Sequence, residues 1–144
     1  MPRPKFTAAN RLSIAQRAGF CCEYCQTPED FSPDIFDIEH IISLANGGKS
    51  DDGNLALACG GCNAFKSTAI SWTDPLTNLI SPLFHPRQDT WSAHFNWNDD
   101  FTELIGLTPK GRATIEKLKM NRHNLVNLRK ALISYGVHPK QTSV

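Results

Sequence analysis

Two pairs of cysteines carry the strongest chemical signal in this sequence of 144 residues. Two residues separate Cys22 from Cys25, and two residues separate Cys59 from Cys62. Each pair can direct two thiolates at one ion, and four thiolates complete a tetrahedral zinc site with bonds of about 2.3 Å. Because all four ligands are cysteines, no position stays open for water, so this zinc is expected to hold the fold and not to catalyse.

Other uses of the cysteines explain the two pairs less well. A redox motif needs only one such pair, which leaves the second pair unexplained. The fifth cysteine, Cys21, is interpreted as a small buried thiol, although a register in which it replaces Cys22 is also open. The odd number of cysteines argues against a disulfide framework and favours a reducing compartment.

A second group of polar residues lies between the cysteine pairs and just beyond them. Glu39 and His40 are adjacent, Asn54 follows a polar, glycine-rich loop, and Asn63 directly follows a predicted zinc ligand. Lys66 comes three residues after Asn63 and shares its helix face. A lone Glu-His pair is ordinarily a solvated glutamate beside a buried histidine, whereas the larger group indicates a site for a metal or a phosphate.

Short elements are predicted to position these residues. The predicted order is strand, loop, short extended segment and helix, at residues 35–42, 46–53, 54–58 and 62–69. Adjacent residues of a strand point to opposite faces. Glu39 and His40 therefore reach one phosphate only at the end of a strand or at a bulge.

Further elements flank this unit. A basic arm comes first, and a helix is predicted at residues 8–18, with Gly19 as its end. Residues 71–92 carry prolines, and their apolar residues show no clear helical or strand period, which predicts an irregular connection. That connection is expected to bury its apolar side chains, namely Trp72, Leu76, Leu79, Ile80, Leu83, Phe84 and Trp91.

The C-terminal part is predicted to contain a hairpin and two helices. The hairpin joins residues 94–97 to residues 102–106. Thr108 is the expected N-cap of the first helix, with Pro109 at its first position. Asn121 is the expected cap of the second helix, which Gly136 ends and which has Leu125, Leu128 and Leu132 as its apolar stripe.

The composition is that of an ordinary globular chain, with 40% hydrophobic and 20% charged residues. A formal net charge of +1 means that any contact with nucleic acid must come from a local basic patch. No apolar run approaches the roughly 20 residues that span a bilayer, and no apolar signal core follows the N-terminus. These features lead us to expect a cytoplasmic protein.

Several of these motifs together resemble the HNH endonuclease family. They are Ile38-Glu39-His40-Ile41-Ile42, Gly47-Gly48, Asp52-Gly53-Asn54-Leu55 and Cys59-x-x-Cys62-Asn63-x-x-Lys66, and the cysteine pairs match the subgroup with four structural cysteines. The resemblance covers about residues 20–67. The tail, with Leu83-Phe84-His85-Pro86-Arg87 and Gly106-Leu107-Thr108-Pro109, is similar to short standalone bacterial HNH proteins.

The resemblance implies an α+β fold with a ββα-metal core stapled by zinc. The core is expected at residues 20–70, after an arm and helix at residues 1–19. A C-terminal extension, residues 71–144, is expected to pack on it with a hairpin and two helices.

The resemblance also implies metal-dependent hydrolysis of phosphodiester bonds in DNA. His40 matches the general base, Glu39 the acidic metal ligand, and Asn54 the loop asparagine that orients the histidine. Asn63 matches the second metal ligand, at the position where the family name refers to a histidine. One carboxylate and one amide oxygen favour magnesium or manganese.

Other contacts with nucleic acid are predicted more weakly. Lys66 and Arg87 are candidates, as are the cations of the C-terminal helices, which equally suit a solvated surface. His85, His94 and His123 are open as metal ligands or phosphate contacts, and a structural role in packing is preferred for each. A homodimer is left open, since one such site cuts one strand at a time. The alternative function is a non-catalytic, zinc-stapled module that binds nucleic acid.

Overall fold

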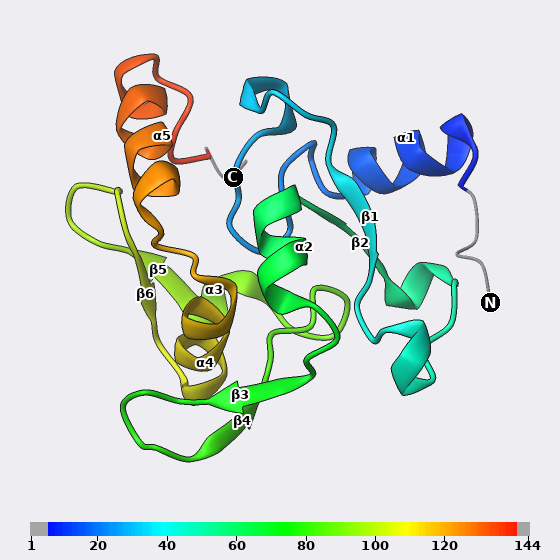
Figure 1. The fold of residues 1–144 in the computed structure, drawn as a ribbon. Helices are drawn as coiled ribbons and strands as arrows, with labels where there is room; N and C mark the ends of the chain where they lie inside the picture. Colours follow the sequence, from blue (N-terminus) through cyan, green and yellow to red (C-terminus); the bar gives the residue numbers. More distant parts are fainter. Residues whose placement is uncertain (1–5, 141–144) are drawn as a thin grey trace. The chain divides into compact units, whose positions relative to one another are not determined.

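The computed structural model describes residues 6–140, so the predicted basic arm lies mostly outside the described residues (Figure 1). The chain divides into two units. The first contains residues 6–68 and 85–89, and the second contains residues 69–84 and 90–140. Within residues 6–140, none of the helices has the length and apolar character needed to cross a membrane.

Helix α1 (Ala8–Arg17) opens the first unit, as predicted. The hydroxyl of Thr7 accepts a hydrogen bond from the Asn10 backbone N–H, and the Asn10 side chain accepts one from the Thr7 N–H. This reciprocal pair is a capping box, which satisfies two donors at the start of the helix. Ile14 and Ala15 form the buried side of α1.

The centre of the first unit is a ββα arrangement. Strands β1 (Asp37–His40) and β2 (Leu55–Ala58) pair antiparallel, with His40 opposite Leu55. All four residues of β2 are buried. Helix α2 (Gly60–Lys66) follows β2 after one residue and lies beside the strand pair in Figure 1. The predicted α+β class and the strand–loop–strand–helix order are therefore confirmed, with a shorter first strand.

The second unit contains two hairpins and three helices. They are β3 (Ser71–Thr73), β4 (Ile80–Pro82), α3 (Trp91–His94), β5 (Phe95–Trp97), β6 (Leu104–Gly106), α4 (Pro109–Leu118) and α5 (His123–Ser134). The predicted hairpin and the Thr108 cap are confirmed, since the Thr108 hydroxyl accepts from the Gly111 N–H at 3.0 Å. Helix α5 begins one residue later than an Asn121 cap requires, because the Asn121 amide is bound to both backbone groups of Leu104 in β6.

The prediction for residues 71–92 was wrong in two respects. Residues 71–82 form the β3–β4 hairpin, which pairs Trp72 with Ser81. Leu83 and Phe84 are buried, but Leu76 is 73% exposed and Ile80 is 76% exposed. A hairpin of two three-residue strands has one face against α4, so the apolar residues at its tip and on its outer face meet solvent.

The turn of this hairpin is built around the fully buried carboxylate of Asp74. Asp74 accepts hydrogen bonds from the Leu76 N–H at 3.0 Å and from the Thr77 hydroxyl at 2.9 Å. Arg112 in α4 completes the arrangement with two guanidinium contacts of 2.9 Å. This bidentate pair ties the turn to α4 and holds the pKa of Asp74 well below its usual range.

We expect Asp74→Asn to lower the melting temperature by several degrees at pH 7, because the ion pair with Arg112 is lost. A lowered pKa means that the stabilisation is present above the unfolded carboxyl pKa of about 3.9 and is lost as pH falls through the folded value. The difference from wild type should therefore shrink below about pH 4. Calorimetry across this pH range measures it, with the exposed Asp99→Asn as control. An equal change in melting temperature for both variants would contradict the stabilising role of the Asp74–Arg112 ion pair.

Candidate active site

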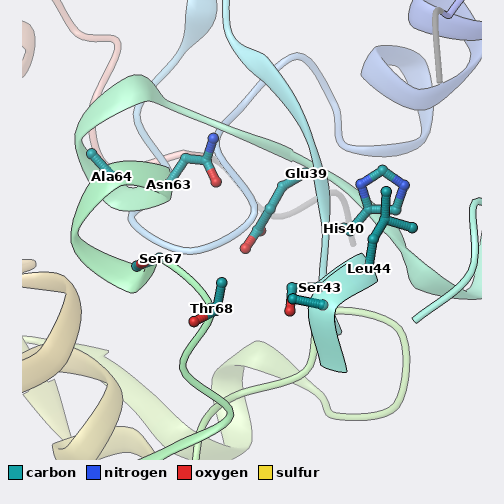
Figure 2. A pocket seen from close by; sticks show the side chains of 9 residues that line it. Glu39, His40, Ser43, Leu44, Asn63, Ala64, Ser67 and Thr68 are labelled. Carbon is teal, nitrogen blue, oxygen red and sulfur yellow. The ribbon is translucent and has the colours of Figure 1, made fainter. Parts of the chain in front are cut away.

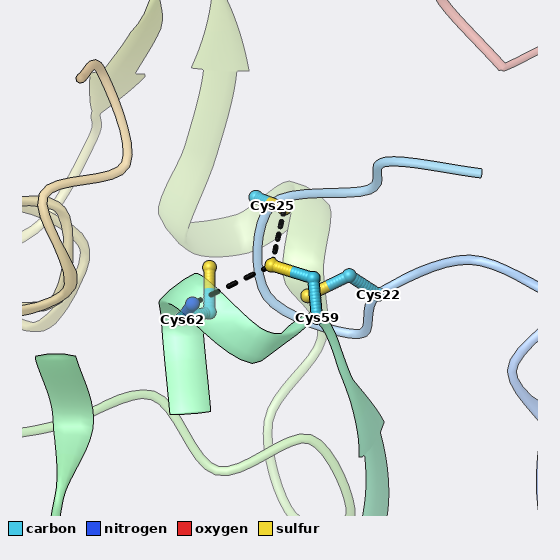
Figure 3. A group of neighbouring side chains, drawn as sticks. All are labelled: Cys22, Cys25, Cys59 and Cys62. Carbon is cyan, nitrogen blue, oxygen red and sulfur yellow. Dashed lines mark hydrogen bonds between the residues drawn. The ribbon is translucent and has the colours of Figure 1, made fainter. Parts of the chain in front are cut away.

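Four cysteine sulfurs converge in the first unit. Their Sγ atoms all lie within 4.8 Å of one another, and all four residues are buried (Figure 3). The Sγ atoms of Cys25 and Cys59 are 3.7 Å apart. Sulfurs held 2.3 Å from a central ion in a tetrahedron lie about 3.8 Å apart, so the donor set fits zinc.

The backbone around each pair brings the sulfurs together. In the first pair, Cys22 donates to the Thr27 carbonyl and Gln26 donates to the Cys22 carbonyl, both at 2.9 Å. In the second pair, Cys59 is the N-cap of α2, and its sulfur accepts from the Cys62 N–H at 3.4 Å. We call residues 22–25, with this turn, the first knuckle.

The protonation of these thiols also points to a cation. Burial raises the pKa of the Cys22 thiol, whereas hydrogen bonding, first of all with Cys22, lowers the pKa of Cys59. Four buried thiols at this separation become thiolates together only when a positive ion balances their charge. The cluster includes Cys22 and not Cys21, which pairs through its backbone with Pro28 instead.

Glu39 and His40 both line one pocket because β1 ends at His40. The pocket has a volume of about 470 Å³ and is also lined by Asn63 of α2 (Figure 2). Its remaining wall comes from the residues after β1 and from α2 and its end, namely Ser43, Leu44, Ala45, Ala64, Ser67 and Thr68. The expected strand end is thus present, and the two adjacent residues reach a common space.

The carboxylate of Glu39 is buried beside a lysine. Its Oε1 lies 2.7 Å from Nζ of Lys66, and the two side chains are 4% and 3% exposed. Lys66 also donates to the Ile41 carbonyl at 2.8 Å. Burial raises the pKa of Glu39, and the Lys66 charge opposes that rise. Lys66 was predicted to contact DNA, but in this structure it is the internal counter-ion of Glu39.

Asn63 is oriented by an acidic residue that the sequence did not single out. Its Nδ2 donates to Oδ2 of Asp37 at 3.0 Å. The amide oxygen therefore faces the other way, and Figure 2 shows it pointing toward Glu39. Asp37 lies two residues before Glu39 in β1, so the period of a strand places both on the same face. The two-residue spacing between Asp37 and Glu39 is therefore the sequence signal that could have identified Asp37.

Asn54 holds the loop that follows β1 and does not contact His40 directly. Its Oδ1 accepts from the Ile42 N–H, and its Nδ2 donates to the carbonyls of Ile42 and Lys49, at 2.8 to 2.9 Å. Gly48 is required here, since a Cβ would lie 1.8 Å from the Ile42 carbonyl oxygen. The fixed loop presents Ser50, whose hydroxyl lies 2.8 Å from Nε2 of His40.

The remaining candidates take part in local contacts. Arg87, proposed as a DNA contact, is 17% exposed and forms an ion pair with Glu23, which favours a structural role. Nδ1 of His85 accepts from the Arg87 N–H, and Nδ1 of His94 lies 2.7 Å from the Thr108 hydroxyl. His123 is exposed and contacts Asn127.

The comparison with protein families identifies this part of the chain. Residues 22–68 match the model described as HNH endonuclease. This segment is an HNH domain. The match begins at the first zinc ligand and ends at Thr68 in the pocket wall, so the HNH domain contains the four cysteines and every residue that lines the pocket. The curated proteins and the solved structures contained no match to the chain.

We expect the purified protein to carry one zinc per chain, and Cys62→Ser to lose it. Zinc content measured by a chromophoric chelator and folding measured by circular dichroism should fall together, because metal binding and folding are coupled in such a site. Cys21→Ser is the matched control, since Cys21 is buried but outside the cluster. Retention of one zinc by Cys62→Ser would exclude the four-cysteine site.

Proposed function

We propose that this protein is a metal-dependent endonuclease that hydrolyses phosphodiester bonds in DNA. One observation carries the proposal. The end of β1 brings Glu39 and His40 to the same pocket, where the amide oxygen of Asn63 is turned toward Glu39. A general base and two oxygen ligands beside one cavity are the parts that phosphodiester hydrolysis requires.

His40 is proposed as the general base that takes a proton from the attacking water. When its Nε2–H donates to the Ser50 hydroxyl, Nδ1 carries the lone pair that accepts a proton. Asn54 acts indirectly, because it fixes the loop that presents Ser50. The role of Asn54 is thus to hold the histidine's partner in place.

Glu39 and Asn63 are proposed to hold magnesium or manganese. Magnesium typically binds through one or two carboxylates, with water and substrate phosphate in the other positions, so two protein oxygens at an open pocket fit it. The bound ion would stabilise negative charge on the scissile phosphate and the leaving oxygen. Asp37 keeps Asn63 in the required orientation, and Lys66 balances the charge of Glu39.

The alternative is a zinc-stapled module that binds nucleic acid without cleaving it. The buried pair of Glu39 and Lys66 favours catalysis over this alternative. Replacing a buried ion pair by apolar residues is often neutral or stabilising, so a purely structural module gains little from a carboxylate at the wall of a pocket.

We expect His40→Ala to lower nicking of supercoiled plasmid DNA by a factor of about 10² to 10⁴, the usual contribution of a general base. The assay is run with magnesium and with manganese, and zinc content should stay at one per chain. His123→Ala is the control, because His123 is exposed on α5. Equal nicking by wild type and His40→Ala would refute the assignment of His40 as the general base. Binding of DNA that weakens with salt, without cleavage by wild type, would support the alternative.

A further inference from the structure

The two carboxylate oxygens of Glu39 have different surroundings. Oε1 forms the ion pair with Nζ of Lys66, at 2.7 Å. Oε2 is also buried, and it has no hydrogen-bond partner among residues 6–140. Burying a carboxylate oxygen without a partner has a large desolvation cost. An orphaned oxygen on a side chain that lines a pocket therefore fits a ligand for a cation.

The ammonium of Lys66 is itself held from a second side. It donates a hydrogen bond to the Ile41 carbonyl at 2.8 Å, directly after the end of β1. Lys66 is the last residue of α2, and its side chain is buried in a close-packed interior. The contact with Oε1 of Glu39 is therefore a fixed part of the pocket wall, unlike an exposed ion pair for which water competes.

Asn63 is restricted in the same way, by a partner from the opposite element. Asp37 of β1 accepts from Nδ2 of Asn63 at 3.0 Å, which leaves the amide oxygen to face Glu39 (Figure 2). Strand β1 thus orients Asn63 of α2, while α2 orients Glu39 of β1 through Lys66. Each exchange leaves one oxygen for the pocket, namely Oδ1 of Asn63 and Oε2 of Glu39.

We infer that Lys66 is a positioning residue that limits Glu39 to a single oxygen and so makes the site select magnesium against calcium. The inference rests on the proposed function, in which Glu39 and Asn63 hold the divalent ion. Magnesium requires a near-octahedral shell and keeps several waters, so two single oxygens from the protein suffice. Calcium takes about six to eight oxygens and often binds both oxygens of a carboxylate. Because the ammonium holds Oε1, the site denies calcium this second oxygen.

Lys66→Met tests this inference, because it removes the ammonium and keeps an unbranched side chain at the buried position. Lys130→Met, at an exposed position of α5, is the matched control. Mn²⁺ is bound to each zinc-loaded protein and is then displaced with Mg²⁺ or Ca²⁺, while free Mn²⁺ is followed by electron paramagnetic resonance. Loss of the lysine charge changes the attraction for both displacing ions to a similar extent. The quantity that tests the inference is therefore the ratio of their dissociation constants.

We expect the ratio of the calcium to the magnesium dissociation constant to fall about 10-fold in Lys66→Met, which is the lower end of the effect that an outer partner of a metal ligand has on affinity. Lys130→Met should keep the wild-type ratio. An unchanged ratio in Lys66→Met, with one zinc per chain retained, refutes the inference and leaves Lys66 as a structural counter-ion of Glu39.

Glu39→Gln, measured in parallel, separates this inference from the proposed function. Equal Mn²⁺ binding by wild type and Glu39→Gln refutes Glu39 as a ligand of the ion, and the inference fails with it. Weaker Mn²⁺ binding by Glu39→Gln, together with an unchanged ratio in Lys66→Met, refutes only the role of Lys66.

A second measurement uses the wild-type protein and does not depend on the folding of Lys66→Met. Among residues 6–140, Lys66 is the lysine that is buried, so its ammonium is shielded from water and can be followed by NMR of protein labelled with ¹⁵N-lysine. We expect its Nζ signal to shift and to persist as Mg²⁺ saturates the protein, because the ammonium stays on Oε1 beside the ion. A signal that disappears at saturation, or that does not shift, overturns the inference.

Discussion

Four sulfurs from two distant segments meet within 4.8 Å, and the rest of the HNH domain depends on that convergence. Cys25 and Cys59 are 34 positions apart, so bringing the two cysteine pairs together closes a long loop. Closing such a loop has an entropic cost that grows slowly with length, and a metal that binds the folded state tightly offsets it. The loop contains β1, and its closure sets where Glu39 and His40 stand relative to α2.

Burial of Glu39 is the second constraint, since a carboxylate removed from water needs a compensating charge or hydrogen bonds. Lys66 supplies the charge, and its side chain spans from Glu39 to the Ile41 carbonyl. In the proposed function, a divalent ion at Glu39 would lie close to an ammonium that is already in place.

Much of this site was predictable from residue types at fixed spacing. The cysteine pairs, the need for a strand end or a bulge at Glu39 and His40, and the helix after Cys59 all follow from local rules of ligand geometry and strand period. The contacts of Asn54 and the pairing of Asp37 with Asn63 did not follow, because they depend on how the loop and α2 return to β1. The prediction for residues 71–82 was wrong because a three-residue strand shows no period, and the turn depends on the contacts of Asp74 with Leu76, Thr77 and Arg112.

The exposed tip of the β3–β4 hairpin has a consequence for how the protein behaves at high concentration. Leu76 and Leu79 lie in the turn and Ile80 begins β4, and all three side chains are largely exposed, while Asp74 hydrogen-bonds within the turn. The sequence pI is about 7.7, which leaves little net charge at neutral pH to keep molecules apart. We therefore expect this small apolar surface to promote self-association near the pI, and buffers well away from the pI to keep the protein dispersed.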